Sequence, residues 1–496
     1  MTEHQSSYRQ IMKATALFGG VQIINVFVQI IRSKVVAVLL GPTGMGILGL
    51  LNSTMALMGS LTNFGLKTSA VKDISAEYVS LNNFRIAVII TTLRRLVWIT
   101  GCLGTLLVLI FSSLLSKLTF GNNDFTIAFI WISVTLLFQQ LSSGQFVILQ
   151  GMRKLKSLAK ANVLGSCIGL VVTLPLYYIY GTDGIVPGIL GTSLVTLFLS
   201  WYFSNKVAVE PVNVSYSQTL SEGKSMLRMG FMISLSGLLT TGGSYIVRIF
   251  ISRTGGIDEV GLYNAGFSII NTYVGMIFSA MATDYYPRLS AVAHDNFLCK
   301  KTINQQAEIA LLILSPILIV FLVFINWIVV LLYSNQFIAV NTMIYWAAMG
   351  MFFKSSSWSI GFIFLAKGSS RLFLWNEIIT NLYLLGLNII GYHYWGLTGL
   401  GVSFAVSYLL HLLQVFVVSR IKFSFSFDLA IFKIFFVQFS MAVISFFVVT
   451  NLSADYSYIV GMFLVVASSW YSFVELDKRL SLSEVISNFK NRIGRK

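Results

Sequence analysis

Fourteen apolar runs, each about 20 residues or longer, constrain this chain more than any other feature. A helix of that length crosses the hydrocarbon core of a bilayer while satisfying its own backbone hydrogen bonds. The composition agrees, because 56% of the 496 residues are hydrophobic and only 10% are charged. The sequence therefore predicts an all-α integral membrane protein with fourteen transmembrane helices. The predicted spans lie near residues 14–40, 46–66, 96–118, 126–150, 159–180, 185–205, 229–252, 261–283, 307–333, 340–366, 372–394, 399–420, 429–450 and 456–474.

The distribution of basic residues predicts the orientation. If the N-terminus is cytoplasmic, 28 of the 34 lysines and arginines lie in or beside cytoplasmic loops, and the opposite loops hold only Lys117 and Arg253. Because Lys and Arg are concentrated on the cytoplasmic side of membrane proteins, we expect both termini in the cytoplasm. This asymmetry also accounts for the net charge of +16, so no nucleic-acid partner is expected. Membrane lipids are the expected partners of the basic tail.

Glycine-containing segments repeat at a constant offset. GPTGMGILG at 41–49 and GGIDEVGLY at 255–263 each separate two apolar runs, and YGTDG at 180–184 resembles WGLTG at 395–399. The offset of 215 residues relates Gly46 to Gly261, Gly181 to Gly396 and Gly184 to Gly399. We interpret the chain as two parallel six-helix repeats, and in transporters built from such repeats the substrate path lies between them.

This repeat predicts the domain organisation. The expected parts are an N-terminal lobe at 8–205, a cytoplasmic linker at 206–226, a C-terminal lobe at 227–422, an extra helix pair at 428–475 and a basic cytoplasmic tail at 476–496. We expect the corner glycines to serve tight turns, because glycine is favoured at positive φ and where backbones approach closely. These glycines are Gly41, Gly44, Gly46, Gly255, Gly256 and Gly261.

Four basic residues lie within apolar runs, where a charge costs several kcal/mol unless it has a partner, water or a ligand. They are Arg32, Lys34, Arg248 and Lys354. For Lys34 the favoured interpretation is a structural or snorkelling charge. For the other three we favour a water-accessible cavity that binds an anion, with a structural role as the alternative.

Two of these charges end polar stripes. Gln22, Asn25, Gln29 and Arg32 step by 3, 4 and 3 residues and so share one helix face. Arg248 ends a stripe of small and polar residues that contains Gly230, Ser234, Gly237, Thr241 and Ser244. Such a stripe also permits close helix packing, so packing and a wet surface stay open as alternatives. Asn264, Ser268 and Asn271 form a third stripe that suits sugar hydroxyls.

Short motifs carry a family resemblance. The corners LLGPTGMG and GGIDEVGLYNAG and the helix exits YYPRLS and LAKGSSR resemble the polysaccharide-transporter (Wzx-type) branch of the multidrug/oligosaccharidyl-lipid/polysaccharide (MOP) exporter superfamily. The resemblance implies a V-shaped pair of six-helix lobes plus two C-terminal helices. It also implies a flippase, not an enzyme, that moves undecaprenyl-pyrophosphate-linked repeat units of O-antigen or a related polysaccharide across a bacterial inner membrane by alternating access.

Other functions are weighed against this one. A peptidoglycan-precursor flippase also has two repeats plus two helices, and it is the closest alternative. A drug/cation antiporter would need membrane carboxylates, and a polymerase or glycosyltransferase would need a large loop outside the membrane. Helices 1, 2, 7 and 8 contain no carboxylate away from their ends, and the outward loops are short. No cofactor or metal is expected, and coupling to protons or to sodium stays open. Other polysaccharide assembly proteins are conceivable partners besides the lipid-linked oligosaccharide.

Overall fold

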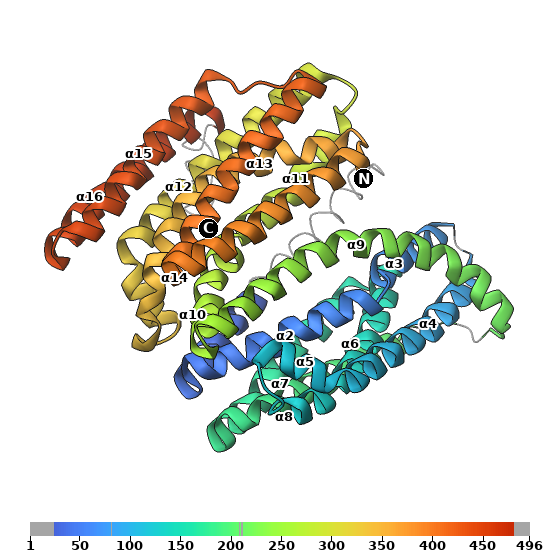
Figure 1. Ribbon diagram of the computed structural model, residues 1–496. Coiled ribbons are helices and arrows are strands. Elements are labelled where there is room, and N and C mark those ends of the chain that lie inside the picture. Colours follow the sequence, from blue (N-terminus) through green and yellow to red (C-terminus); the bar gives the residue numbers. More distant parts are fainter. Residues whose placement is uncertain (1–23, 81, 208, 210–211, 481–496) are drawn as a thin grey trace, which may run out of the picture. The chain divides into compact units, whose positions relative to one another are not determined.

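The computed structural model describes residues 24–80, 82–207, 209 and 212–480 of the chain. Within these ranges every regular element is helical, as Figure 1 shows. Ten of the described helices are long and apolar enough to cross a bilayer. Two of them, Leu155–Asn205 and Ser370–Phe423, each bend sharply at a glycine and correspond to two predicted spans. With the helix over residues 24–39 and α9 (Tyr216–Thr254), the described part of each of the fourteen predicted spans is wholly or mostly helical, and residues 14–23 of the first span lie outside the described residues.

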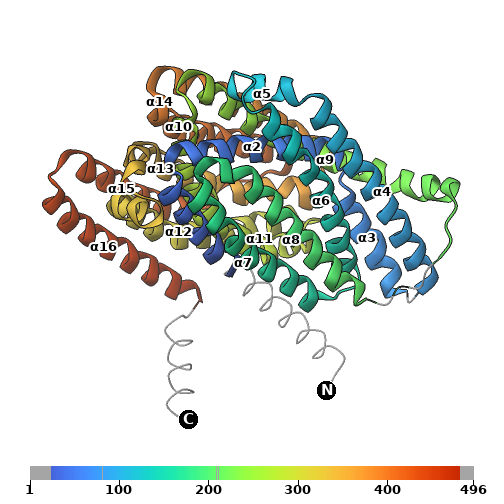
Figure 2. The same cartoon turned by 90° about the horizontal axis from the view of Figure 1, so that it is seen from below.

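The chain divides into two compact units. Figures 1 and 2 label the helices of each unit. The first unit covers Met1–Gly261 and Leu332–Ser334, and the second covers Leu262–Leu331 and Asn335–Lys496. After residues 24–39, the first unit contains α2 (Gly41–Thr62), α3 (Leu66–Val79), α4 (Asn83–Ile110), α5 (Ser112–Phe120), α6 (Thr126–Gly151), α7 (Leu155–Tyr180), α8 (Ile185–Asn205) and α9. The second contains α11 (Met276–Ala291), α12 (Asn296–Leu332, up to Leu331), α13 (Asn341–Ala366), α14 (Ser370–Phe423), α15 (Leu429–Asn451) and α16 (Ala454–Leu480). The helix α10 (Ile257–Ser268) contributes to both.

The division between the units differs from the predicted lobe boundary at residue 227. The helix α9 packs against α2, α3, α4 and α5, and the first unit extends to Gly261. Close backbone contact explains this packing, because a Cβ atom on Gly65 would overlap the backbone of Gly230, and a Cβ atom on Gly230 would overlap that of Phe64 and Gly65. The glycines therefore let α9 lie directly against the turn between α2 and α3.

The predicted linker at 206–226 is in large part ordered helix. Since α9 begins at Tyr216, only the first half of this segment connects helices. The guanidinium of Arg85 donates to both carboxylate oxygens of Glu222, at 2.6 and 3.2 Å. The Nη1 atom of Arg95 donates to the carbonyl of Val214 at 2.8 Å and to Thr219 Oγ1 at 2.7 Å. Two arginines of α4 thus hold the start of α9.

The second unit ends in the helix pair expected at 428–475. Its helices α15 and α16 join through a buried amide, because Gln438 donates to Ser472 Oγ at 2.8 Å and accepts from Ser468 Oγ at 2.6 Å. The end of α16 is fixed on α12, where Arg479 Nε lies 2.5 Å from a carboxylate oxygen of Glu308. Buried polar pairs of this kind fix register between helices that are otherwise apolar.

The internal repeat is visible in the backbone. Gly181, between α7 and α8, has φ 56° and ψ −129°. Gly396, at the bend of α14, has φ 56° and ψ −138°. This conformation is accessible to glycine and strained for other residues, so one hairpin geometry occurs twice at the offset of 215.

A second pair of glycines confirms the same offset. A Cβ atom on Gly184 would overlap the carbonyl of Leu176, and one on Gly399 would overlap that of Gly391. Gly184 precedes Gly399 by 215 residues, and Leu176 precedes Gly391 by the same number. The helices of each hairpin therefore meet at the same backbone crossing in both repeats.

Candidate functional site

The polar face of the first helix carries an unpaired cation. Gln22 lies outside the described residues, while Asn25 Oδ1 accepts from Ser166 Oγ at 3.3 Å and Gln29 is exposed. Arg32 is half-buried and has no hydrogen-bond or ion-pair partner in the described part of the chain. A guanidinium with five N–H donors and no partner among the described residues is available to an anion.

Lys34 differs from its neighbour Arg32. Its Nζ atom donates to the carbonyl of Tyr333 at 2.6 Å, and both residues belong to the first unit. The structural role that the sequence favoured for Lys34 is therefore the one that the structure shows.

The sequence left close packing and an open polar surface as alternatives for the stripe on α9, and its positions differ in this respect. At Gly230 it serves close packing, as described above. At Gly237 it does not, because this glycine is exposed and a Cβ atom there would have no heavy atom within 4 Å. Thr241 Oγ1 donates to the carbonyl of Gly237 at 2.8 Å, and Arg248 Nη1 donates to that of Ser244 at 3.0 Å. These two bonds stay within α9, while Ser234 of the same stripe donates to Asn63 Oδ1 at 3.2 Å.

Lys354 lies in the second unit, on α13, and points at a distorted turn. Its Nζ atom donates to Asn271 Oδ1 at 2.8 Å. Asn271 belongs to a π-helical segment, Ile269–Val274, and π-helical turns occur frequently at functional sites. The ammonium also lies 4.9 Å from the ring centroid of Tyr408 and 5.5 Å from that of Phe404. An amide oxygen and two aromatic faces thus hold the cation without neutralising it.

A polar chain continues from this lysine along α14. The rings of Tyr408 and His411 lie 6.1 Å apart, and His411 Nε2 lies 3.4 Å from Asn376 Nδ2. Gln414 Nε2 donates to Asn376 Oδ1 at 2.6 Å. The Nδ1 atom of His411 is buried without a partner in the described residues. The segment from Lys354 to Gln414 is therefore a polar path within an apolar helix group.

The sequence interpretation missed His411, Asn376 and Gln414. A signal was present, because His411 and Gln414 are three residues apart in an apolar run and so share a helix face. Their partner Asn376 lies 35 residues before His411, on the other arm of the bent helix. The bend at Gly396 brings the two arms together, and this pairing could not be read from spacing alone.

The corner glycines lie where a positive φ or a close contact favours glycine, with one exception. Gly41 has φ 64° and Gly256 has φ 92°, and these two are related by the offset of 215. A Cβ atom on Gly44 would overlap the side chain of Leu40. Gly255 was expected to belong to this set, but its φ of −116° is open to any residue. The positive φ of this turn falls on the neighbouring Gly256, so the backbone does not require glycine at position 255.

Gly46 and Gly261 form a reciprocal crossing within the first unit. A Cβ atom on Gly46 would overlap the carbonyl of Ile257, and one on Gly261 would overlap the carbonyl of Pro42. Pro42 and Ile257 are themselves related by the offset of 215. Beside them Thr43 Oγ1 donates to Asp258 Oδ1 at 2.5 Å, again between equivalent positions. The starts of α2 and α10 therefore meet with local two-fold symmetry.

Each unit by itself carries a cation together with uncharged polar groups: Arg32 and the α9 stripe in the first, and Lys354 and the amides beside it in the second. No cluster of three or more His, Cys, Asp or Glu side chains in the described residues could hold a metal ion. None of the ion pairs in the described ranges includes Arg32 or Lys354. Fixed cations together with amide and hydroxyl groups suit phosphates and sugar hydroxyls.

Comparisons with known proteins agree on one family. A family described as polysaccharide biosynthesis protein matches residues 35–342. A Shigella flexneri protein named as an O-antigen transporter is 24% identical over 387 residues, which cover 75% of this chain and 88% of that protein. The lipid III flippase of Escherichia coli (strain K12) is 20% identical over 369 residues, covering 74% of this chain and 88% of the flippase.

Two solved structures share the fold. An inward-facing multidrug resistance transporter of the MATE family, of the MOP superfamily, has a TM-score of 0.68 at 16% identity and covers 83% of this chain and 98% of its own. The lipid II flippase MurJ, in an inward closed conformation, has a TM-score of 0.68 at 12% identity and covers 95% of this chain and 99% of its own. Since the family match spans more than half of the residues, this chain belongs to the polysaccharide biosynthesis protein family and has the fold of the MOP exporter superfamily.

Proposed function

We propose that this protein is a flippase for undecaprenyl-pyrophosphate-linked oligosaccharides, such as O-antigen repeat units. It moves them from the cytoplasmic to the periplasmic leaflet of a bacterial inner membrane by alternating access. Both termini lie in the cytoplasm, as the distribution of basic residues indicates. The related proteins named above are transporters and flippases, which supports transport without chemical conversion of the substrate.

The observation that carries this proposal is that each unit has, in an apolar helix, a cation that forms no ion pair with a described residue. Arg32 and Lys354 have no carboxylate partner in the described residues, although a buried charge is costly without compensation. A pyrophosphate supplies that compensation when it binds, and bidentate guanidinium contacts would fix its position. Arg248 adds a third cation on α9.

The uncharged polar groups suit the sugar part of such a substrate. The exposed middle of the α9 stripe and the path from Asn271 to Gln414 offer amides, hydroxyls and aromatic rings. Sugars present many hydroxyls and apolar ring faces, so these groups could bind varied oligosaccharides without a charge match. Within each unit taken by itself, we therefore assign the cation to a phosphate group and the uncharged polar groups to sugar hydroxyls.

A peptidoglycan-precursor flippase is the second candidate function. The likeness to MurJ covers 95% of this chain, and α15 and α16 supply the two helices that follow the repeats. The two candidates differ in the sugar that the carrier lipid bears. A drug or cation antiporter is disfavoured, because the three charged side chains assigned to the site are all cations.

A transport assay in proteoliposomes tests the proposal. The purified full-length protein is reconstituted with a fluorescent undecaprenyl-pyrophosphate oligosaccharide, and a membrane-impermeant quencher reports the fraction in each leaflet. We expect the protein to equilibrate this lipid between leaflets and to form no new glycosidic bond. Movement of lipid II in place of the oligosaccharide lipid would support the second candidate. Failure to move either lipid, in vesicles where a known flippase is active, would refute both.

A further inference from the structure

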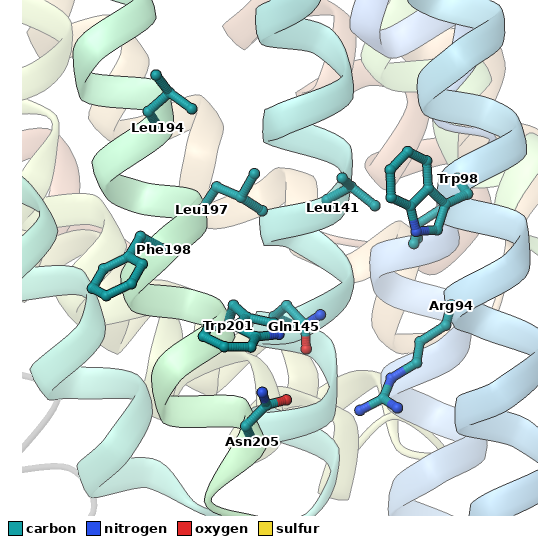
Figure 3. A pocket seen from close by; sticks show the side chains of 10 residues that line it. Arg94, Trp98, Leu141, Gln145, Leu194, Leu197, Phe198, Trp201 and Asn205 are labelled. Carbon is teal, nitrogen blue, oxygen red and sulfur yellow. The ribbon is translucent and has the colours of Figure 1, made fainter. Parts of the chain in front are cut away.

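A hollow of about 550 Å³ lies on the first unit where α4, α6 and α8 meet, and none of the residues assigned to the substrate lines it. Figure 3 shows α6 between the other two helices. The residues of α8 that line the hollow, from Leu194 to Asn205, follow one helix face over about 16 Å. The hollow opens outward, because Trp98, Phe198 and Trp201 are between 50% and 62% exposed.

The lining of this groove changes from apolar to polar along its length. Leu194, Leu197 and Phe198 of α8 line one end. Arg94 and Asn205 lie at the other end, as Figure 3 shows, and Asn205 is the last residue of α8. Two tryptophans, Trp98 and Trp201, line the groove near this polar end, and tryptophan is enriched at the boundary between hydrocarbon and headgroups. The groove therefore matches an amphiphile whose polar head lies beside Arg94.

Two polar groups of the groove lack partners in the described part of the protein. Arg94 has no hydrogen bond or ion pair there, and Gln145 Oε1 is buried without a donor. Lys206, next to Asn205, adds a positive charge at the same helix end. The residues that line the groove include no carboxylate. The groove therefore offers a donor for a phosphate and an acceptor for a hydroxyl, in a positive environment.

We propose that this groove binds one phosphatidylglycerol-type phospholipid of the surrounding membrane. The phosphate lies on Arg94, a headgroup hydroxyl donates to Gln145, and an acyl chain follows Leu197 and Leu194. Phosphatidylcholine fits less well, since its headgroup has no O–H or N–H donor for Gln145 and no net negative charge for Arg94. This lipid is a bound regulator or structural lipid, separate from the transported one.

Native mass spectrometry of the full-length protein tests this assignment. The protein is titrated with phosphatidylglycerol and phosphatidylcholine at equal concentrations, and the bound fraction of each is measured. We expect the protein to prefer phosphatidylglycerol. Arg94→Gln should lower its affinity for that lipid roughly 10- to 150-fold, because a charge-assisted hydrogen bond is lost. Gln145→Leu should lower the affinity for phosphatidylglycerol and leave that for phosphatidylcholine unchanged.

Arg371→Gln is the matched control, because Arg371 is an exposed arginine near a helix start in the second unit. It should bind phosphatidylglycerol as the unmodified protein does. Arg94→Lys keeps the charge and should give an intermediate affinity, which separates loss of the contact from loss of folding. Equal binding of the two phospholipids, or full phosphatidylglycerol binding by Arg94→Gln, would overturn the proposal. Displacement of phosphatidylglycerol by equimolar undecaprenyl phosphate would also overturn it and assign the groove to the transported lipid.

Discussion

The glycine crossing at the start of α2 and α10 yields a quantitative prediction. Gly46→Ala and Gly261→Ala each place a methyl group where a carbonyl of the other helix already lies, so the two helices must separate. Overpacking of this kind costs about 1–3 kcal/mol. Alanine itself favours a helix interior over glycine by about 1 kcal/mol, which partly offsets that cost. The two positions are equivalent under the internal repeat, so both variants should be destabilised to a similar extent.

Gly361→Ala is the matched control for this experiment. Gly361 lies inside α13, and a Cβ atom there would have no heavy atom within 4 Å. It therefore gains the helix propensity without the overlap, and its melting temperature should stay the same or rise. The stabilities are compared by heating the detergent-purified proteins and measuring the folded fraction by fluorescence-detected size exclusion. If Gly46→Ala and Gly261→Ala melt no lower than Gly361→Ala, the crossing does not constrain the fold and the reasoning fails.

Three further predictions follow from the structure. Lys354→Met should reduce flipping, whereas Lys354→Arg should retain part of it, because arginine keeps the positive charge that the cation–π contacts and the bond to Asn271 require. Vesicle transport rates check this, and equal rates for Lys354→Met and the unmodified protein would contradict it. Gly41→Val and Gly256→Val should lower the yield of folded protein, since valine disfavours positive φ, whereas Gly255→Val should be tolerated; size-exclusion profiles decide, and equal losses for all three would be the opposing result. Reporter fusions after Asn123, Asp183 and Asp258 should be periplasmic and those after Arg153 and Lys300 cytoplasmic; reversal at any two sites would refute the proposed orientation.

The fold was largely predictable from the sequence because its strongest signals are local. Each apolar run alone indicates a membrane helix, and the glycines that repeat at 215 residues mark equivalent turns. The matching φ and ψ of Gly181 and Gly396 show why the spacing is informative, since both positions have a positive φ that glycine adopts without strain. In contrast, the grouping of α9 with the first unit depends on a glycine contact between Gly65 and Gly230, which no local pattern reveals.

The candidate site was predictable only in part. A cation within an apolar run is conspicuous, so Arg32, Arg248 and Lys354 could be selected by position. Their partners could not, because Asn271 and Lys354 are 83 residues apart and Asn271 lies in a π-helical turn that no sequence pattern indicates. The same holds for Arg94 and Gln145, which share a groove only because α4 and α6 lie side by side.

The central claim is that cations of the two repeats bind the pyrophosphate of the transported lipid. The most direct measurement compares the unmodified protein with the Arg32→Ala, Arg248→Ala double variant in the vesicle assay with the fluorescent oligosaccharide lipid. Loss of one charge-assisted hydrogen bond costs about 1.5–3 kcal/mol, so the affinity of the double variant for the substrate should fall roughly 10- to 150-fold or more. The double variant should still insert into the membrane and fold. Flipping by the double variant at the unmodified rate and affinity would contradict the claim and make these arginines structural.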